Sequence, residues 1–398
     1  MKTKTLRALT AATGLLLTLT ACGTSTSPAT DSPTSKDSTT ASSPSPGASA
    51  TAGSAGYLTS VCPSPIKIQL GWYPQPDPYA MVFGLLAPGG KLDTNAASYT
   101  STALADPDQK IEIDGGGPLV SYQQVSSLMY AHPDILLGDV SLDEAISQSK
   151  KFSTVGVIAP FEKSPLGLMY NPSAADLSSL QKVKDSNTTV LAVSGQTSIA
   201  ALVGLGKLNK SQVDSSYNYS PARFVAANGH IAQQAFATEE PYAYENSPFW
   251  KKPTKVLLMA DQGYPNYQND FAVTPANLKS KAACLQRLVP LMQQSMVDYF
   301  KSPDATNTLI SDLSTKLKNP TPVTIGAENF AADVMKSQGL VANAPGSSTF
   351  GSFDTSRVQN MVQIVTPVFK GNANFDPAVK PEDLVTNQFL DPSIGFAK

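Results

Sequence analysis

Aromatic side chains crowd the loop that follows the first predicted strand. Residues 71–79 read Gly-Trp-Tyr-Pro-Gln-Pro-Asp-Pro-Tyr. Three prolines should prevent regular structure there, so we expect a rigid loop that presents its rings. Trp72, Tyr73 and Tyr79 could stack on a planar or apolar solute, and the tyrosine hydroxyls would add hydrogen-bond donors. The alternative is that these rings pack on a neighbouring helix.

Two glycine-containing turns supply candidates of a second kind. Residues 194–198 read Ser-Gly-Gln-Thr-Ser and stand between a predicted strand and a predicted helix. A helix N-terminus favours negative or electron-rich groups, and these side chains offer hydrogen bonds. The turn can also be explained as a helix cap alone. The glycines at 115–117 could cradle an anion, or simply form a tight turn. The candidates from both turns are Gly116, Gly117, Gly195, Gln196, Thr197 and Ser198.

Acidic and tyrosine residues follow other predicted strands. Glu239 and Glu240, with Tyr242, come at the end of one strand, where a carboxylate facing a cleft would select an amine. A solvated acidic turn is the alternative. Asp139 follows a buried strand and could bind a ligand or cap the next helix. Tyr264 lies in a proline-containing stretch and could close over a ligand, or belong to a surface loop.

The sequence contains no recognisable catalytic or metal-binding motif. His132 and His230 are isolated, and there is no His-Glu-x-x-His run, nucleophile elbow or Cys-x-x-Cys pair. We therefore expect no enzymatic activity, no cofactor and no metal. With 15% charged residues, a net charge of −2 and no basic cluster, nucleic acid is not an expected partner. Lysines and arginines are few in the candidate loops, which favours an aromatic or heterocyclic solute, neutral or cationic, over a strong anion.

The first 56 residues have the composition of an export and anchoring segment. Basic residues precede an apolar run at 8–21, which is too short to span a bilayer and is typical of a secretory signal. Leu-Thr-Ala-Cys-Gly at 19–23 resembles the lipobox of bacterial lipoproteins. The resemblance implies a signal peptide of residues 1–21 and lipidation of Cys22. Residues 22–56, rich in Ser, Thr, Ala, Pro and Gly, predict a disordered tether or a glycosylated stalk.

Two cysteines remain once Cys22 is assigned to the lipid. Cys62 and Cys284 would stand in a compartment where disulfides persist, so we predict that they pair. Two buried free thiols are the alternative. A disulfide here would close a loop of about 220 residues and stabilise the fold by a few kcal/mol.

The predicted elements alternate between strands and helices. Apolar runs followed by turns and amphipathic segments are typical of a parallel α/β sheet. Ser141 and Glu144 have the spacing of a capping box at the start of one helix. Apolar residues at spacings of three and four predict a long helix over 278–300, kinked at Pro290. The predicted strands are 66–70, 111–113, 134–139, 190–193, 222–225, 235–238 and 255–259.

The order of these elements predicts two α/β lobes, of which the first is discontinuous. We assign residues 57–160 to the first part of lobe I and residues 161–262 to lobe II. Residues 263–398 would return to lobe I and form the C-terminal helices.

The same landmarks resemble the extracytoplasmic solute-binding proteins of ABC importers, in the branch that binds nitrate, taurine, sulfonates and thiamine pyrimidines. The resemblance spans about 63–390. It rests on the Gly-Trp-Tyr-Pro loop, on Ile-Leu-Leu-Gly-Asp at 135–139, on Ser-Pro-Leu-Gly-Leu at 164–168 and on the acidic-Pro-aromatic turn at 237–242. Segments at 115–118, 148–150 and 229–234 resemble actinobacterial lipoproteins of this type.

The resemblance implies the type II periplasmic-binding-protein fold, with two α/β lobes, a two-strand hinge and a central ligand cleft. It implies a monomer, held on the outer face of the cell membrane by the lipid on Cys22, that delivers a solute to permease and ATPase subunits. Thiamine-pyrimidine relatives have Trp-x-Pro-Asn and then a histidine where Tyr79 stands, so their ligand is not carried over. A ligand-sensing or surface interaction lipoprotein without a transport role is the alternative.

Overall fold

The computed structural model describes residues 51–321 and 323–397 of the chain. The predicted signal peptide, Cys22 and the tether up to residue 50 lie outside these residues. Among the helices of the described part, none combines the length and the apolar composition needed to cross a membrane.

The first sheet has seven strands. Their order across the sheet is β2-β3-β4-β1-β5-β12-β6. β1 runs parallel to both β4 and β5, whereas β12 is antiparallel to β5 and β6. The hairpin of β2 and β3 extends the sheet beyond β4. The strands are β1 (Ile66–Gln69), β2 (Lys91–Asp93), β3 (Ser98–Ala103), β4 (Asp106–Asp114), β5 (Ile135–Asp139), β6 (Val155–Ile158) and β12 (Phe271–Val273).

The second sheet has five strands in the order β11-β7-β10-β8-β9. β8 is parallel to β9 and β10, whereas β7 is antiparallel to β10 and β11. The strands are β7 (Leu166–Tyr170), β8 (Val190–Leu191), β9 (Val213–Asp214), β10 (Ala232–Phe236) and β11 (Lys255–Leu258).

The chain crosses between the two sheets twice, and each crossing leads into an antiparallel strand. Residues 159–165 connect β6 to β7, and residues 259–270 return from β11 to β12. The strands entered by the two crossings, β7 and β12, each run antiparallel to both of their neighbours. The protein thus has two α/β lobes, one on each sheet, joined by two segments.

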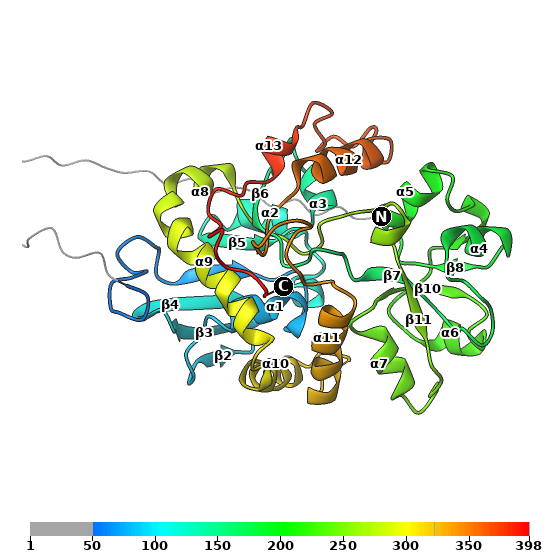
Figure 1. Ribbon diagram of the computed structural model, residues 1–398, viewed down its shortest axis with the longest axis horizontal. Helices are drawn as coiled ribbons and strands as arrows, with labels where there is room; N and C mark the ends of the chain where they lie inside the picture. The colour runs from blue at the N-terminus through cyan, green and yellow to red at the C-terminus, as the bar shows by residue number, and fades with distance from the viewer. Residues whose placement is uncertain (1–50, 322, 398) are drawn as a thin grey trace, which may run out of the picture. The chain divides into compact units, whose positions relative to one another are not determined.

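Helices surround both sheets, and Figure 1 shows α4 to α7 grouped around the strands of the second. The 3₁₀ turns are Gly117–Val120, Lys210–Gln212 and Ala260–Gln262. The helices are α1 (Pro76–Phe83), α2 (Val125–Ala131), α3 (Leu142–Ser147), α4 (Leu180–Asp185), α5 (Thr197–Gly204), α6 (Ala222–Ala226), α7 (Glu240–Glu245), α8 (Pro275–Ser280), α9 (Ala282–Tyr299), α10 (Asp304–Lys316), α11 (Ile325–Ser337), α12 (Thr355–Val365) and α13 (Pro381–Leu384).

Several local predictions are corrected by the structure. The short apolar run at 222–225 is helix α6 and not a strand, because such a run fits either element until its packing decides. Regular structure begins at Pro76, since prolines are tolerated in the first turn of a helix. The long helix is divided into α8 and α9 at Lys281, and Pro290 lies inside α9.

The predicted capping box at the start of α3 does not form. The Oγ atom of Ser141 accepts hydrogen bonds from the backbone N–H of Asn269 (3.0 Å) and from the Nε2 atom of Gln268 (2.9 Å). The Glu144 carboxylate instead accepts a hydrogen bond from the backbone N–H of Ser126 at 3.0 Å. Both side chains therefore bond to residues distant in the sequence and not to the backbone of their own helix.

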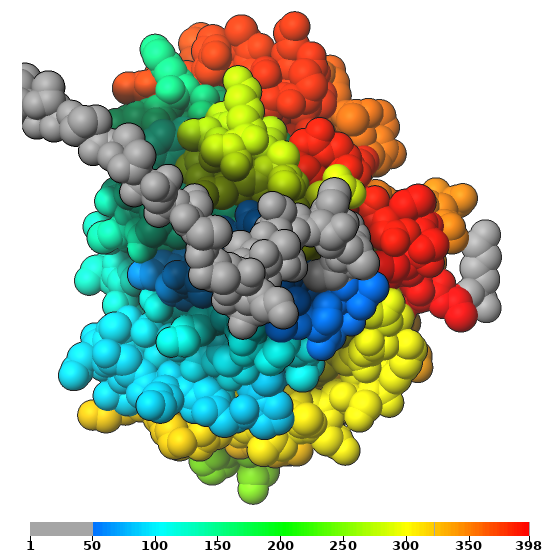
Figure 2. Space-filling view, turned by 90° about the vertical axis from the view of Figure 1, so that its left-hand side faces the viewer, coloured from blue at the N-terminus to red at the C-terminus, as the bar shows by residue number. Residues whose placement is uncertain are grey.

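The N-terminal segment of the described chain is attached to α9. Cys62 and Cys284, predicted to pair, form a disulfide in the structure, with their Cα atoms 4.7 Å apart. The guanidinium of Arg287 hydrogen-bonds to Ser60 at 2.9 Å and stacks over the ring of Tyr57. In the space-filling view this blue segment lies against yellow residues of the helical region (Figure 2). The start of the folded part is therefore joined to an element more than 200 residues later.

Candidate functional site

The two lobes meet through polar side chains that follow β1 and β10. The Nε2 atom of Gln75 donates to the Oε1 atom of Glu239 at 2.6 Å, and the hydroxyl of Thr238 donates to the carboxylate of Asp77. Both contacts join the carboxyl edge of the first sheet to that of the second. We refer to Asp77, Glu239 and Glu240 as the interlobe carboxylates.

Local structure at each strand end positions these groups. Asp77 has non-helical backbone angles within the first turn of α1, and its carbonyl accepts a hydrogen bond from Gln75 at 2.9 Å. Across the site, Glu240 begins α7 and its carboxylate accepts a hydrogen bond from the backbone N–H of Phe236 at 2.7 Å. The junctions β1–α1 and β10–α7 therefore hold the carboxylates in place.

Burial controls the protonation of this site. It raises the pKa of Asp77 to about 7, despite the hydrogen bond from Thr238, which lowers it. It also raises the pKa of Glu240 to about 7. The pKa of Glu239 lies well above its usual value because of burial and then of the charges on Asp77 and Glu240. Asp77 and Glu240 therefore change charge near neutral pH.

An aromatic cluster adjoins the interlobe carboxylates. We use this name for Trp72, Tyr122 and Tyr219. The ring of Trp72 lies 6.0 Å from that of Tyr122, in the first lobe, and 5.3 Å from that of Tyr219, in the second. Its face covers Gly117, where a Cβ atom would overlap the indole. The ring of Tyr219 lies 5.6 Å from that of Tyr217, whose hydroxyl accepts a hydrogen bond from the Nε2 atom of Gln233 at 3.1 Å. Gln233 stands on β10, the strand that leads to Glu239 and Glu240, so the cluster adjoins the carboxylates.

Three predicted site residues are buried and bonded to other parts of the chain, so the structure does not bring them to the interlobe contacts. The Tyr79 hydroxyl donates to Asp139 at 2.5 Å and accepts from the backbone N–H of Gly71. The Asp139 carboxylate also accepts from the Nδ2 atom of Asn269 at 2.9 Å. Tyr264 is 1% exposed and donates to Asp143 at 2.7 Å. Internal hydrogen bonds occupy these groups.

The glycine run after β4 forms a tight turn. A Cβ atom on Gly116 would overlap the carbonyl oxygen of Leu70, and Gly117 has a φ of +59°. The backbone N–H of Gly116 donates to the carbonyl of Trp72 at 2.9 Å. This turn thus supports the aromatic loop and is not an anion cradle.

The remaining predicted residues lie at the edges of the lobes. Residues 194–198 follow β8, at the same edge of the second sheet as Glu240, and Gln196 hydrogen-bonds weakly to Gln234 and Ser198. Tyr73 is buried and lies edge-on to Trp72. Tyr242 contacts Phe330 of α11, with ring centroids 5.5 Å apart.

Sequence reasoning did not select several residues that the structure places at this site. Asp77 and Gln75 lie in the proline-rich loop, of which only the aromatic residues were predicted to bind a ligand. The partner of Asp77, Thr238, is 161 positions away along the chain. Tyr122 and Tyr219 stand in segments without a motif, so no local pattern pointed to them.

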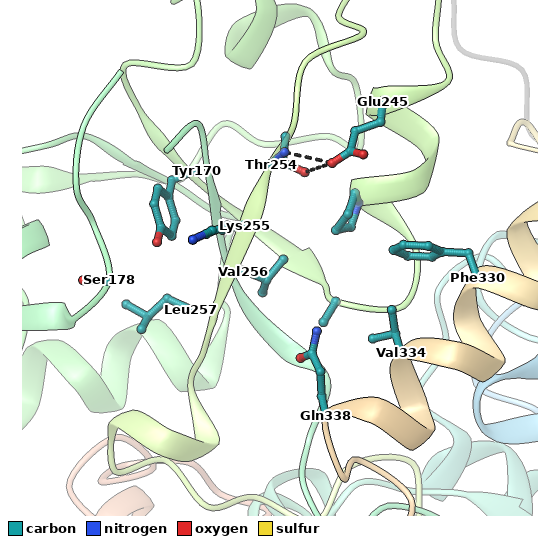
Figure 3. Close-up of a pocket in the computed structure, with 12 residues that line it drawn as sticks. Tyr170, Ser178, Glu245, Thr254, Lys255, Val256, Leu257, Phe330, Val334 and Gln338 are labelled. Atoms are coloured by element: carbon teal, nitrogen blue, oxygen red, sulfur yellow. Dashed lines mark hydrogen bonds between the residues drawn. The ribbon is translucent and has the colours of Figure 1, made fainter. Parts of the chain in front are cut away.

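A cavity of about 560 Å³ lies beside the site, between the lobes. Figure 3 shows that it is bounded by β11 on one side and, on the other, by Phe330 and Val334 of α11 and by Gln338 directly after this helix. Glu245 also lines this cavity, and its carboxylate accepts a hydrogen bond from the backbone N–H of Thr254 at 2.8 Å. Ala237 and Pro241, which are neighbours of the interlobe carboxylates in the sequence, line this cavity. None of the ligand-binding residues predicted from the sequence lines it.

The buried carboxyl of Glu328 should make stability depend on pH. The residue is 0% exposed on α11, and neither oxygen has a hydrogen-bond partner within the described part of the chain. Burial raises its pKa from 4.5 to about 8, and Tyr299 is the titratable neighbour that its charge affects. The folded chain therefore keeps a proton that the unfolded chain loses, so this group destabilises the fold as pH rises from about 4.5 to about 8.

Glu328→Gln should accordingly raise the free energy of unfolding at pH 8 by about 2 kcal/mol and leave it nearly unchanged at pH 5. Urea unfolding of both proteins at the two pH values measures this. An equal gain at both pH values would indicate a packing effect, and no gain at either would contradict the burial of an ionisable carboxyl.

Comparisons with known proteins leave the family open. No protein-family model matches the sequence, and no curated protein matches it. Among solved structures, a zinc-bound ligand-binding component of an ABC-type import system from Staphylococcus aureus is 14% identical, with 81% of this chain and 97% of that chain covered and a TM-score of 0.49.

Two further structures give similar values. The aliphatic sulphonate binding protein SsuA from Escherichia coli is 14% identical, over 71% of this chain and 89% of its own, with a TM-score of 0.43. A Candida albicans protein described as having the generic periplasmic binding protein fold is 10% identical, over 83% and 98%, with a TM-score of 0.46. All three TM-scores are below 0.5, so the fold is assigned from the chain itself, which has two α/β sheets joined by two segments, as the resemblance implies. The chain has the periplasmic-binding-protein fold.

Proposed function

We propose that this chain is an extracytoplasmic solute-binding protein that captures a small organic solute between its lobes and delivers it to an ABC importer. The observation that supports this most directly is the meeting of side chains from both lobes, at Asp77–Thr238 and at Trp72–Tyr219. In α/β sheets, ligands bind beyond the carboxyl ends of the strands, which is where these contacts lie. A solute held there would touch both lobes.

In this proposal, the conformational change that binding causes is closure of the two lobes around the solute. A ligand that bridges both lobes shifts the equilibrium toward the closed form by its differential affinity, and the permease would recognise that form. The aromatic cluster favours an aromatic or heterocyclic solute. In this proposal the protein is monomeric, residues 161–262 form lobe II between the two parts of lobe I, and the lipid on Cys22 holds the protein near its permease and ATPase.

The proposal is tested by measuring the melting temperature of the purified protein against vitamins, nucleobases, amines, sulfonates and aromatic acids. A ligand at about 100 times its dissociation constant stabilises a protein by about 2.7 kcal/mol. A shift confined to one chemical class supports solute binding. No shift in any class, with no ligand retained through purification, contradicts it. Uptake of the identified solute by cells that lack the chain then separates transport from sensing.

Trp72→Ala should weaken binding of that solute by about 10–100-fold without unfolding the lobe, because the ring is only half-buried. Trp250→Phe is the matched control, since Trp250 packs in the second lobe against Phe224. As the chain has two tryptophans, the control variant leaves Trp72 as the only fluorescent indole and reports binding by its emission. An unchanged affinity in Trp72→Ala would remove this residue from the site.

A further inference from the structure

The interlobe carboxylates have no basic partner in residues 51–321 and 323–397. The ion pairs of this part of the chain involve other acidic residues. Asp77 is 1% exposed, and its Oδ1 atom has no hydrogen-bond partner among the described residues. Buried carboxylates in proteins are normally paired. The negative charge at this site is therefore balanced by protons or by a group that the described chain does not provide.

The aromatic cluster has an unusual exposure and backbone geometry. Tyr122 is 60% exposed and Tyr219 is 48% exposed, yet both rings face Trp72 from opposite lobes. Tyr122 has a φ of +58° and Tyr219 a φ of +66°, in the left-handed region that bulky residues rarely adopt. Such outliers occur preferentially at ligand sites. Two exposed rings are thus held at a cost beside the carboxylates.

We propose that this site selects a solute that carries its positive charge on an organic group, such as a quaternary ammonium or an N-alkylated heteroaromatic ring. Aromatic faces attract such cations, and the carboxylates balance their charge. A metal ion fits less well, because the described residues contain no group of three or more His, Cys, Asp or Glu side chains suited to hold one. The inference rests on the proposed function and specifies the charge of the solute.

Pairs of ligands that differ only in charge test this. We would titrate the purified protein calorimetrically with choline and its neutral isostere 3,3-dimethylbutan-1-ol, and with 1-methylnicotinamide and nicotinamide. Each cation should bind at least about tenfold more tightly than its neutral counterpart, which corresponds to about 1.4 kcal/mol.

The double variant Asp77→Asn, Glu240→Gln should remove this discrimination. We expect the affinity for each cation to fall at least tenfold more than the affinity for its neutral counterpart. Glu245→Gln is the matched control, because it removes one charge from the exposed end of the same helix α7. The melting temperature of each variant confirms that it is folded.

The affinity for the cations should also rise with pH between 5.5 and 7.5, because Asp77 and Glu240 must lose their protons to balance the charge. Affinity for the neutral ligands should not change over this range. The ionisable groups whose pKa values the charges of these two carboxyls raise are Glu239, Tyr79, Tyr299, Tyr217, Tyr219 and Tyr244.

The possible results separate this inference from the proposed function. Preferential cation binding that the double variant abolishes supports both. Equal or tighter binding of neutral or anionic solutes, in this set or in the wider panel, overturns the cation inference and leaves solute binding intact. If no solute of any charge binds the folded protein, both fail.

Discussion

Replacing Cys62 and Cys284 together by alanine should lower the free energy of unfolding by about 2–5 kcal/mol. The disulfide joins residues 222 positions apart, and a cross-link over so long a loop strongly restricts the unfolded chain. Alanine is preferred to serine because Cys284 is fully buried among apolar side chains of α9, where a hydroxyl would add its own cost. Urea unfolding of both proteins, under non-reducing conditions, measures the difference.

Two controls make this result interpretable. Adding a reductant to the wild type should produce a loss similar to that of the double variant. Arg287→Ala removes a neighbouring contact between the same segment and α9 but keeps the disulfide, so it should cost about 1 kcal/mol or less. If the double variant unfolded at the same urea concentration as the wild type, the covalent link would not contribute to stability.

Arg357→Ala should destabilise the protein by about 3 kcal/mol or more. This side chain, on α12, binds both segments that cross between the lobes. Its guanidinium donates to the carbonyls of Glu162 (2.6 Å), Pro265 (2.7 Å) and Asn266 (2.9 Å). It also lies 3.7 Å from the ring centre of Tyr267. Its loss would leave three carbonyls without their charged donor.

Arg357→Lys should restore little of this loss, because an ammonium group cannot reproduce the planar fork that reaches all three carbonyls and stacks on the ring. Hydrogen exchange should accelerate in residues 159–165 and 259–270 of both variants. Arg223→Ala is the control, since Arg223 forms an exposed ion pair with Asp214 and should change stability by less than about 1 kcal/mol. A loss below 1 kcal/mol in Arg357→Ala would contradict the assigned role.

Much of the fold can be predicted from the sequence, because clear local patterns of apolar residues indicate where its strands and helices lie. Apolar runs at 66–70, 134–139 and 190–193 are close to strands β1, β5 and β8, since buried parallel strands need continuous apolar residues. The alternation of these runs with helices predicts α/β lobes. Weak patterns failed, as at 222–225, where four residues could fit either a strand or the helix that forms.

The candidate site was only partly predictable for a related reason. The sequence marks Trp72, Glu239 and Glu240 as side chains at strand ends, and the fold brings these to the interface of the lobes. Asp139 has the same local context, but Tyr79 and Asn269 occupy its carboxylate. Nothing within the local sequence distinguishes a carboxylate that finds such partners from one that does not.

The sequence by itself determined the strand runs, the aromatic loop, the acidic turn and the pair of cysteines, because each depends on residue type and short-range spacing. The tertiary structure alone decided which charged groups lack a partner. Asp77 and Thr238 meet across 161 positions, and Tyr122 and Tyr219 enclose Trp72 from different lobes. The physical reason is that burial and pairing of polar groups depend on neighbours that only folding brings together.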